Sequence, residues 1–179
     1  MARSPILAPL LALAIGAAAF MPPAATAEAD ARARVAGTQC KAGERVAYSC
    51  ALGRKVVSVC ISAGRQVTYR YGPLGKPEMT VASSGQDGKA RRNEVMLSGG
   101  GNQQHLRFSN GGYEYVVYSG ITGPGFDPPN VRSSGLVVLR GNDEVSSKEC
   151  PRNGELQRIS YADTQFIAED TQQDYEQQY

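Results

Sequence analysis

Residues 104–118 read QHLRFSNGGYEYVVY, and this stretch decides the fold class. Two runs rich in β-branched and aromatic residues flank Asn110-Gly111, the dipeptide that type I′ hairpin turns prefer. Taking that dipeptide as the two-residue loop predicts three cross-strand pairs: Phe108 with Tyr113, Leu106 with Tyr115 and Arg107 with Glu114. Two apolar pairs then share one face and an ion pair lies on the other, which predicts an antiparallel hairpin with one buried face.

The sequence on both sides of this hairpin has the same character. Val67, Tyr69 and Tyr71 alternate with polar residues, as in a half-buried strand. Turn signals such as Gly141-Asn142 separate one short β-prone run from the next, and 20 Gly among 179 residues favour turns over long helices. About nine short strands therefore predict a single all-β domain, an antiparallel sandwich or small barrel with little helix.

A second predicted hairpin limits the ways in which the four cysteines can pair. Residues 45–51 and 56–61 flank Gly53-Arg54, and in the simplest register Cys50 and Cys60 point to opposite faces and cannot bond to each other. Five pairs follow from that register: Cys50 with Val57, Tyr48 with Val59, Val46 with Ile61, Ala47 with Cys60 and Ser49 with Ser58. The favoured disulfides are Cys40–Cys60 with Cys50–Cys150, and the other option is Cys40–Cys50 with Cys60–Cys150. None of these cysteines has the close C-x2-4-C spacing of zinc ligands.

The start of the chain has the pattern of a secretory signal peptide. In residues 1–27, Arg3 precedes an apolar run, and Ala25-Thr26-Ala27 offers small residues for cleavage. After residue 27 no run approaches the ~18 apolar residues of a transmembrane helix. We expect a periplasmic or secreted bacterial protein with two disulfides. The expected organisation is a flexible lead-in over 28–39, a β-domain over 40–162 and an acidic, Gln-rich tail over 163–179.

Several stretches, in order along the chain, resemble a widespread group of uncharacterised exported proteins of proteobacteria. The matching stretches are Cys40–Glu44, Ser49-Cys50, Lys55–Cys60, Tyr69–Gly72, Phe108–Tyr118, and Gly135–Val138 followed by Cys150. The resemblance covers most of 40–159 and implies an exported, β-rich protein with paired cysteines. It brings no activity with it.

Catalytic chemistry finds little support in the sequence. His105 is the single His, no G-x-S-x-G motif occurs, and the hairpin register places His105 on the exposed face. Acids that could form a general acid–base pair are scattered: Glu44, Glu78, Glu94 and Glu114. Gly99-Gly100-Gly101 lacks the Lys-Ser/Thr of a phosphate loop. We expect no catalytic residue, cofactor or metal, with a small hydrolase using His105 or a carboxylate pair as an alternative.

Charge is distributed unevenly, although the net charge of +2 argues against a general nucleic-acid binder. Residues 41–92 hold ten basic and three acidic side chains, whereas 93–179 hold six basic and twelve acidic ones. A basic face could meet an anionic partner, but we expect the two halves to interleave within the sheets and largely cancel.

These observations favour a non-catalytic binding protein of the cell envelope that meets a protein or an anionic envelope component. The candidate interaction residues are Arg65, Arg70, Arg91, Arg92 and Phe126. An alternative is an inhibitor of a secreted hydrolase of lysozyme type, with the proline-rich loop Gly123–Asn130 presenting Phe126.

Overall fold

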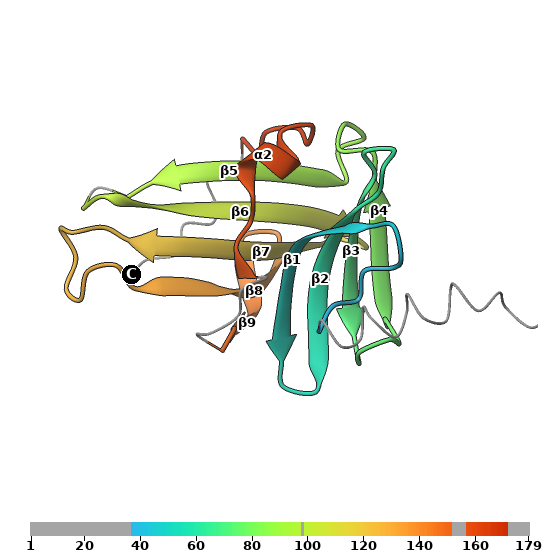
Figure 1. Cartoon of the computed structure of the whole chain (residues 1–179), viewed down its shortest axis with the longest axis horizontal. Coiled ribbons are helices and arrows are strands. Elements are labelled where there is room, and N and C mark those ends of the chain that lie inside the picture. The colour runs from blue at the N-terminus through green and yellow to red at the C-terminus, as the bar shows by residue number, and fades with distance from the viewer. Residues whose placement is uncertain (1–36, 98, 152–156, 172–179) are drawn as a thin grey trace, which may run out of the picture.

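Two antiparallel meanders, each made of strands that pair with their neighbours in sequence, form the protein (Figure 1). The computed structural model describes residues 37–97, 99–151 and 157–171, so the predicted signal peptide over 1–27 lies outside the described residues. The first sheet contains β1 (Arg45–Leu52), β2 (Lys55–Ile61), β3 (Val67–Gly72) and β4 (Met79–Ser83). The second contains β5 (Ala90–Met96), β6 (Gly101–Asn110), β7 (Tyr113–Thr122), β8 (Arg132–Arg140) and β9 (Asp143–Glu149). A four-residue helix, α2 (Tyr161–Thr164), follows, which confirms the predicted all-β class.

The strands of the two sheets cross, and their inner faces enclose the main core (Figure 1). Tyr69 lies at the centre, with its ring centroid 5.3 Å from that of Phe108 and 5.7 Å from that of Tyr115. The alternation of side chains along a strand explains which residues form this core, because every second residue of β2, β3, β6 and β7 points inward. Among the described residues, no helix has the length and hydropathy needed to cross a bilayer.

The central hairpin forms as predicted, but the pairing of its two strands is shifted by two residues from the predicted register. Its loop is Gly111-Gly112, with φ of 60° and 79°, and Asn110 pairs with Tyr113. Both central residues of such a turn need positive φ, which two glycines adopt without a Cβ clash. Leu106, Arg107 and Phe108 consequently face Val117, Val116 and Tyr115, and the predicted Arg107–Glu114 ion pair is wrong. The assignment of faces survives, because a shift of two residues preserves the alternation.

The first hairpin contains a β-bulge that the sequence pattern does not reveal. Tyr48 faces Val59, Ser49 faces Ser58 and Cys50 faces Val57, as predicted. The register shifts between Val46 and Tyr48, so Val46 faces Cys60 and the predicted pairs Ala47–Cys60 and Val46–Ile61 are wrong. The disulfides nevertheless join Cys40 to Cys60 and Cys50 to Cys150, the favoured pairing.

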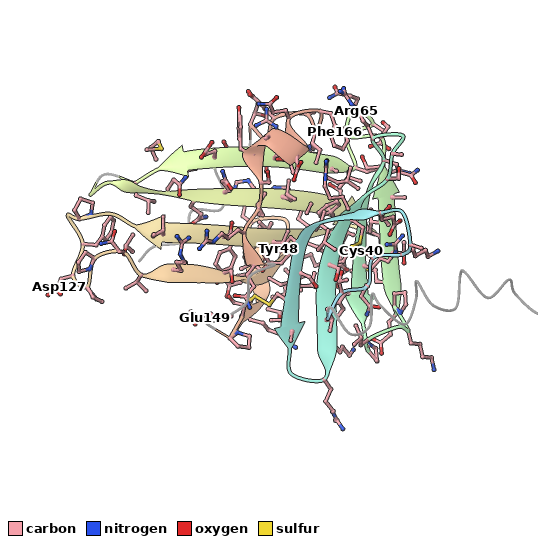
Figure 2. The ribbon with its side chains drawn as sticks, viewed as in Figure 1. Cys40, Tyr48, Arg65, Asp127, Glu149 and Phe166 are labelled. Carbon is pink, nitrogen blue, oxygen red and sulfur yellow. A yellow bond between two sulfur atoms is a disulfide. The ribbon has the colours of Figure 1, made fainter. Side chains whose placement is uncertain are left out.

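Residues 37–44 lie along the outer face of the first sheet, the face turned away from the core (Figures 1 and 2). The Gln39 side chain donates to the carbonyl oxygens of Gly72 and Pro73, and its backbone N–H donates to Ser58 Oγ. The Cys40–Cys60 disulfide fixes this segment to β2. Residues 37–39, the described part of the predicted lead-in, therefore pack against the domain, and Thr38 and Gln39 are buried.

The segment after β9, residues 157–171, returns across both sheets. Ile159 and Ile167 belong to the main core. Further on, the chain runs beside the edge of β5, where the N–H of Arg92 donates to Ala168 O and the N–H of Asp170 donates to Arg92 O. Residues 163–171, the described part of the predicted tail, therefore pack with the β-domain.

Candidate functional site

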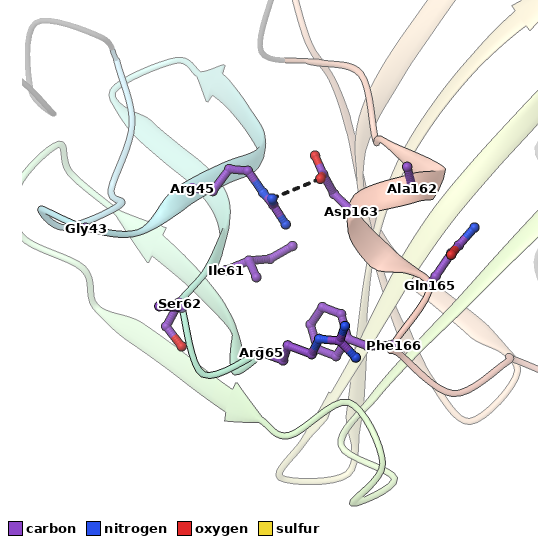
Figure 3. Close-up of a pocket in the computed structure, with 10 residues that line it drawn as sticks. Gly43, Arg45, Ile61, Ser62, Arg65, Ala162, Asp163, Gln165 and Phe166 are labelled. Carbon is purple, nitrogen blue, oxygen red and sulfur yellow. Dashed lines mark ion pairs between the residues drawn. The ribbon is translucent and has the colours of Figure 1, made fainter.

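A pocket of about 660 Å³ opens where the end of the first sheet faces α2 (Figure 3). One wall comes from the start of β1, the end of β2 and the β2–β3 turn, and the other comes from α2 and the residues after it. The lining residues are Gly43, Arg45, Ile61, Ser62, Ala63, Arg65, Ala162, Asp163, Gln165 and Phe166. The site therefore joins segments about a hundred residues apart in the chain.

Two guanidinium groups dominate the chemistry of this pocket. Arg45 forms an ion pair with Asp163, with 3.2 Å between Nη1 and Oδ1, and the Arg45 side chain remains 57% exposed. Arg65 is exposed and has a φ of 56°, a backbone conformation that residues with a Cβ rarely adopt. The Arg65 N–H donates to Ser62 O, which holds the tight β2–β3 turn in this conformation. The turn therefore keeps a positive charge at the pocket, beside Phe166 (Figure 3).

Among the described residues, the lining contains no histidine or cysteine and a single carboxylate, Asp163, which is paired with Arg45. General acid–base catalysis needs a group that can exchange a proton near neutral pH. Two arginines, an amide from Gln165 and a hydroxyl from Ser62 instead form hydrogen-bond donors suited to an anion.

The five residues predicted to mediate interactions lie on different parts of the molecule. Only Arg65 lines the pocket. The other arginines are engaged elsewhere: Arg70 with Glu44, Arg91 with Gly88 O, and Arg92 with Ile167 O and the ring of Tyr161. Arg45 and Asp163, which complete the site, were not singled out, since no local pattern links them.

Phe126 lies in the loop between β7 and β8, at the end of the second sheet that Asp127 marks in Figure 2. A Cβ on Gly99 would come within 2.7 Å of the Phe126 ring, so the ring packs closely on that backbone. The half-buried ring thus contributes to packing within the loop rather than standing out at its tip.

Arg70 and Glu44 form a bidentate ion pair beside the segment 37–44. Arg70 Nη1 and Nη2 lie 2.6 and 2.7 Å from the two carboxylate oxygens, and both side chains are at most 14% exposed. Burial alone would raise the pKa of Glu44. Hydrogen bonds from Arg70 and from the Lys41 N–H, together with the Arg70 charge, outweigh that effect and lower the pKa below 4.5.

We expect Glu44→Gln to lower the free energy of unfolding by about 1.5–3 kcal/mol at pH 7, because charged hydrogen bonds to Arg70 are lost. The folded-state pKa is lowered, so the native carboxylate stabilises fully above the unfolded value near 4.5. This contribution disappears as the pH falls through the folded pKa. Urea unfolding at pH 7 and pH 3 should show the variant converging on the wild type.

The control variant for this measurement is Glu78→Gln, which removes the exposed partner of Lys55. Exposed ion pairs contribute less than about 1 kcal/mol. A difference between wild type and Glu44→Gln that persists unchanged at pH 3 would contradict a role for the Glu44 charge.

His105 is buried, which overturns the prediction of a surface histidine. Its Nε2 lies 3.1 Å from Asp170 Oδ2, and the same oxygen accepts a hydrogen bond from Arg107 Nε at 2.5 Å. All three side chains are at most 1% exposed. The prediction failed because Asp170 comes from a segment more than sixty residues away, which local alternation cannot reveal.

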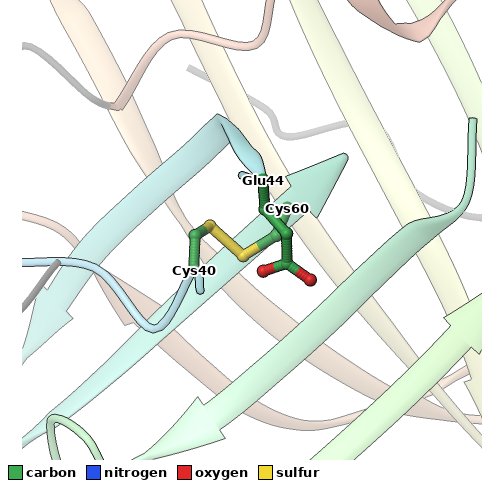
Figure 4. Close-up of side chains that lie close together, drawn as sticks. All are labelled: Cys40, Glu44 and Cys60. Carbon is green, nitrogen blue, oxygen red and sulfur yellow. A yellow bond between two sulfur atoms is a disulfide. The ribbon is translucent and has the colours of Figure 1, made fainter. Parts of the chain in front are cut away.

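Cys40, Glu44 and Cys60 bring their sulfur and carboxylate atoms within 4.8 Å of one another (Figure 4). The two sulfurs are bonded to each other, and both carboxylate oxygens accept from Arg70. Metal ligation by cysteine requires a thiolate. This group is therefore occupied by the disulfide and the ion pair. The other predicted acids each have a separate partner: Glu78 with Lys55, Glu94 with Asn102 and Gln104, and Glu114 with Ser109.

The first sheet comes entirely from the basic half of the chain, and the second comes from the acidic half apart from residues 90–92 of β5, so the expectation that the charges of the two halves interleave within the sheets is wrong. Acidic residues of the C-terminal segment return instead to the basic half, where Asp163 pairs with Arg45 and Glu169 lies 3.7 Å from Arg92. The Arg45–Asp163 pair lies at the pocket, whereas the Arg92–Glu169 pair lies on β5, outside the pocket lining.

Comparison with protein-family models, with curated proteins and with solved structures found no match. The fold itself defines the class: a disulfide-bonded all-β domain of two antiparallel sheets. Its two disulfides indicate an oxidising, extracytoplasmic compartment.

Proposed function

We propose that the protein is a non-catalytic binding domain of the bacterial cell envelope, and that its pocket holds an anionic group of a protein or envelope component. The observation that carries this proposal is that Arg45 and Arg65 both line one pocket, whose described lining offers hydrogen-bond donors but no histidine or cysteine.

The ion pair at the pocket suits exchange with a ligand. Arg45 is more than half exposed, and an exposed ion pair such as Arg45–Asp163 contributes less than about 1 kcal/mol. A carboxylate or phosphate group of a ligand could therefore replace Asp163 as the partner of Arg45 at a small cost in free energy. Arg65, on the β2–β3 turn of the same wall, would bind the same group, since its turn already holds it at the pocket.

We expect inorganic phosphate and a short poly-glutamate peptide to shift the amide NMR signals of 43–45, 62–66 and 163–166. Arg65→Gly should weaken binding about tenfold, as the loss of one charged hydrogen bond predicts. Glycine accepts the positive φ of this position, so the variant keeps the turn. Raising the salt concentration should weaken binding of both probes.

The matched control is Arg54→Ala, which removes an exposed arginine from the β1–β2 turn at the other end of the first sheet (Figure 1). Equal losses of affinity for the two variants would show that general charge, rather than the pocket, attracts the anion. Unchanged NMR signals for 62–66 with both probes would refute the proposal.

A further inference from the structure

Asp163 already occupies one of the two arginines of the pocket. It is the single carboxylate among the described residues that line this site, and its Oδ1 is 3.2 Å from Arg45 Nη1. Figure 3 shows this contact reaching from β1 to α2. A ligand that binds Arg45 must therefore share it with Asp163 or displace the Asp163 carboxylate.

The backbone around Asp163 is anchored on both sides, so a displaced carboxylate stays at the pocket. Before it, the Ile159 N–H donates to Ser119 Oγ, and the Ile159 side chain is buried in the main core. After it, Ile167 is 1% exposed and belongs to the same core. Because each anchor lies only four residues from Asp163 in the sequence, the side chain can turn aside while its backbone remains part of the wall.

The charge of the pocket depends on this acid. Two arginines and one aspartate give the described lining a single net positive charge. One carboxylate of a ligand neutralises that charge, whereas a doubly charged phosphate group would leave excess negative charge beside Asp163. Like charges at short range repel each other, and the repulsion doubles when the charge of the ligand doubles. The lining therefore favours a ligand with one negative charge.

The remaining wall offers an apolar neighbour for such a carboxylate. Ile61 is 4% exposed, and Phe166 is half-buried. Ala63 and Ala162 add methyl groups to the same lining. Binding pockets commonly combine an apolar lining with a few polar groups that orient the ligand. A ligand with an apolar group next to its carboxylate would contact both parts of this pocket.

We propose that Asp163 determines the specificity of the pocket, which takes a single carboxylate attached to an apolar group and discriminates against doubly charged phosphate groups. This inference rests on the proposed function and deepens it, because it names the anionic group and assigns the selection to one residue.

The test compares phenylacetate with benzylphosphonate by NMR titration at pH 8.5, where the carboxylate carries one charge and the phosphonate close to two. The two ligands share a benzyl group and differ in their head groups. The wild type should bind phenylacetate more tightly. Asp163→Asn removes the charge and keeps the size of the side chain. At roughly 6 Å in water one unit charge changes an affinity about threefold, so its removal should strengthen binding about threefold for the carboxylate and about tenfold for the phosphonate. Release of Arg45 helps both ligands, so the ratio of their dissociation constants should change about threefold.

The matched control is Glu169→Gln, which removes an acid of the same segment that lies 3.7 Å from Arg92, outside the pocket lining. It should leave the ratio as in the wild type. An unchanged ratio in Asp163→Asn, an equal change in Glu169→Gln, or a wild type that prefers the phosphonate would overturn the inference and leave the proposed function standing. Weaker binding of both ligands by Asp163→Asn would assign Asp163 a structural role instead. No binding of either ligand to either protein would refute the proposed function and this inference together.

Discussion

Removal of the Cys50–Cys150 disulfide, by the paired substitution Cys50→Ala and Cys150→Ala, is expected to lower the free energy of unfolding by about 4–5 kcal/mol. The bridge closes a loop of 100 residues, and the entropy that a crosslink removes from the unfolded chain grows with loop length. That loss is a large part of the 5–15 kcal/mol typical of a domain. Urea unfolding followed by circular dichroism measures it.

The location of this bridge adds to its effect. Cys50 lies in the main core on β1, and Cys150 follows β9, so the bond joins the two sheets directly. The Tyr48 hydroxyl lies 3.1 Å from Cys150 Sγ and donates to Gly135 O on β8. Alanine at both cysteines would remove buried contacts as well as the crosslink.

The internal comparison is the double variant Cys40→Ala and Cys60→Ala, whose bridge closes only 20 residues. The same model gives it a loss of about 3 kcal/mol. A larger loss for the short bridge than for the long one would show that loop length does not govern the contribution of these disulfides.

Asp170→Ala is expected to cost about 3–5 kcal/mol, because it withdraws a buried carboxylate from Arg107 and His105. Breaking one side of a buried ion pair leaves a charge that water cannot reach. Replacing both sides by apolar groups avoids this penalty, so Asp170→Leu combined with Arg107→Met should recover most of the stability. Thermal and urea unfolding of the single and double variants measure both effects.

The comparison for this cluster is Asp163→Ala, which removes the carboxylate of the exposed Arg45 ion pair. We expect a change below about 1 kcal/mol. If Asp170→Ala were as mild as Asp163→Ala, the buried cluster would contribute little, and burial would not distinguish the two acids.

Much of the fold could be predicted from the sequence, because strands depend on local alternation and on turn residues. The face assignments of the central hairpin were correct even though its loop was misplaced by one residue and its strand pairing by two. The choice between Asn110-Gly111 and Gly111-Gly112 depends on how far β6 and β7 extend, and the sequence gives two acceptable turns. The bulge next to Val46 has no local signal at all.

The candidate site could not be predicted, because its two walls meet only through the tertiary fold. Arg65 stood out as part of a basic segment, yet Asp163 and Gln165 belong to a stretch read as a tail. The burial of His105 has the same origin, since alternation tells which side of a strand a residue occupies and not whether another segment covers that side.

The position of Cys150 after the last strand also bears on what each disulfide needs in order to form. Cys40, Cys50 and Cys60 lie within 20 residues of one another, whereas Cys150 follows all nine strands. The first hairpin turns Cys60 outward toward the segment of Cys40 and turns Cys50 inward. The Cys40–Cys60 bridge therefore requires only the first hairpin and the segment before it, whereas the Cys50–Cys150 bridge requires both sheets to be in place.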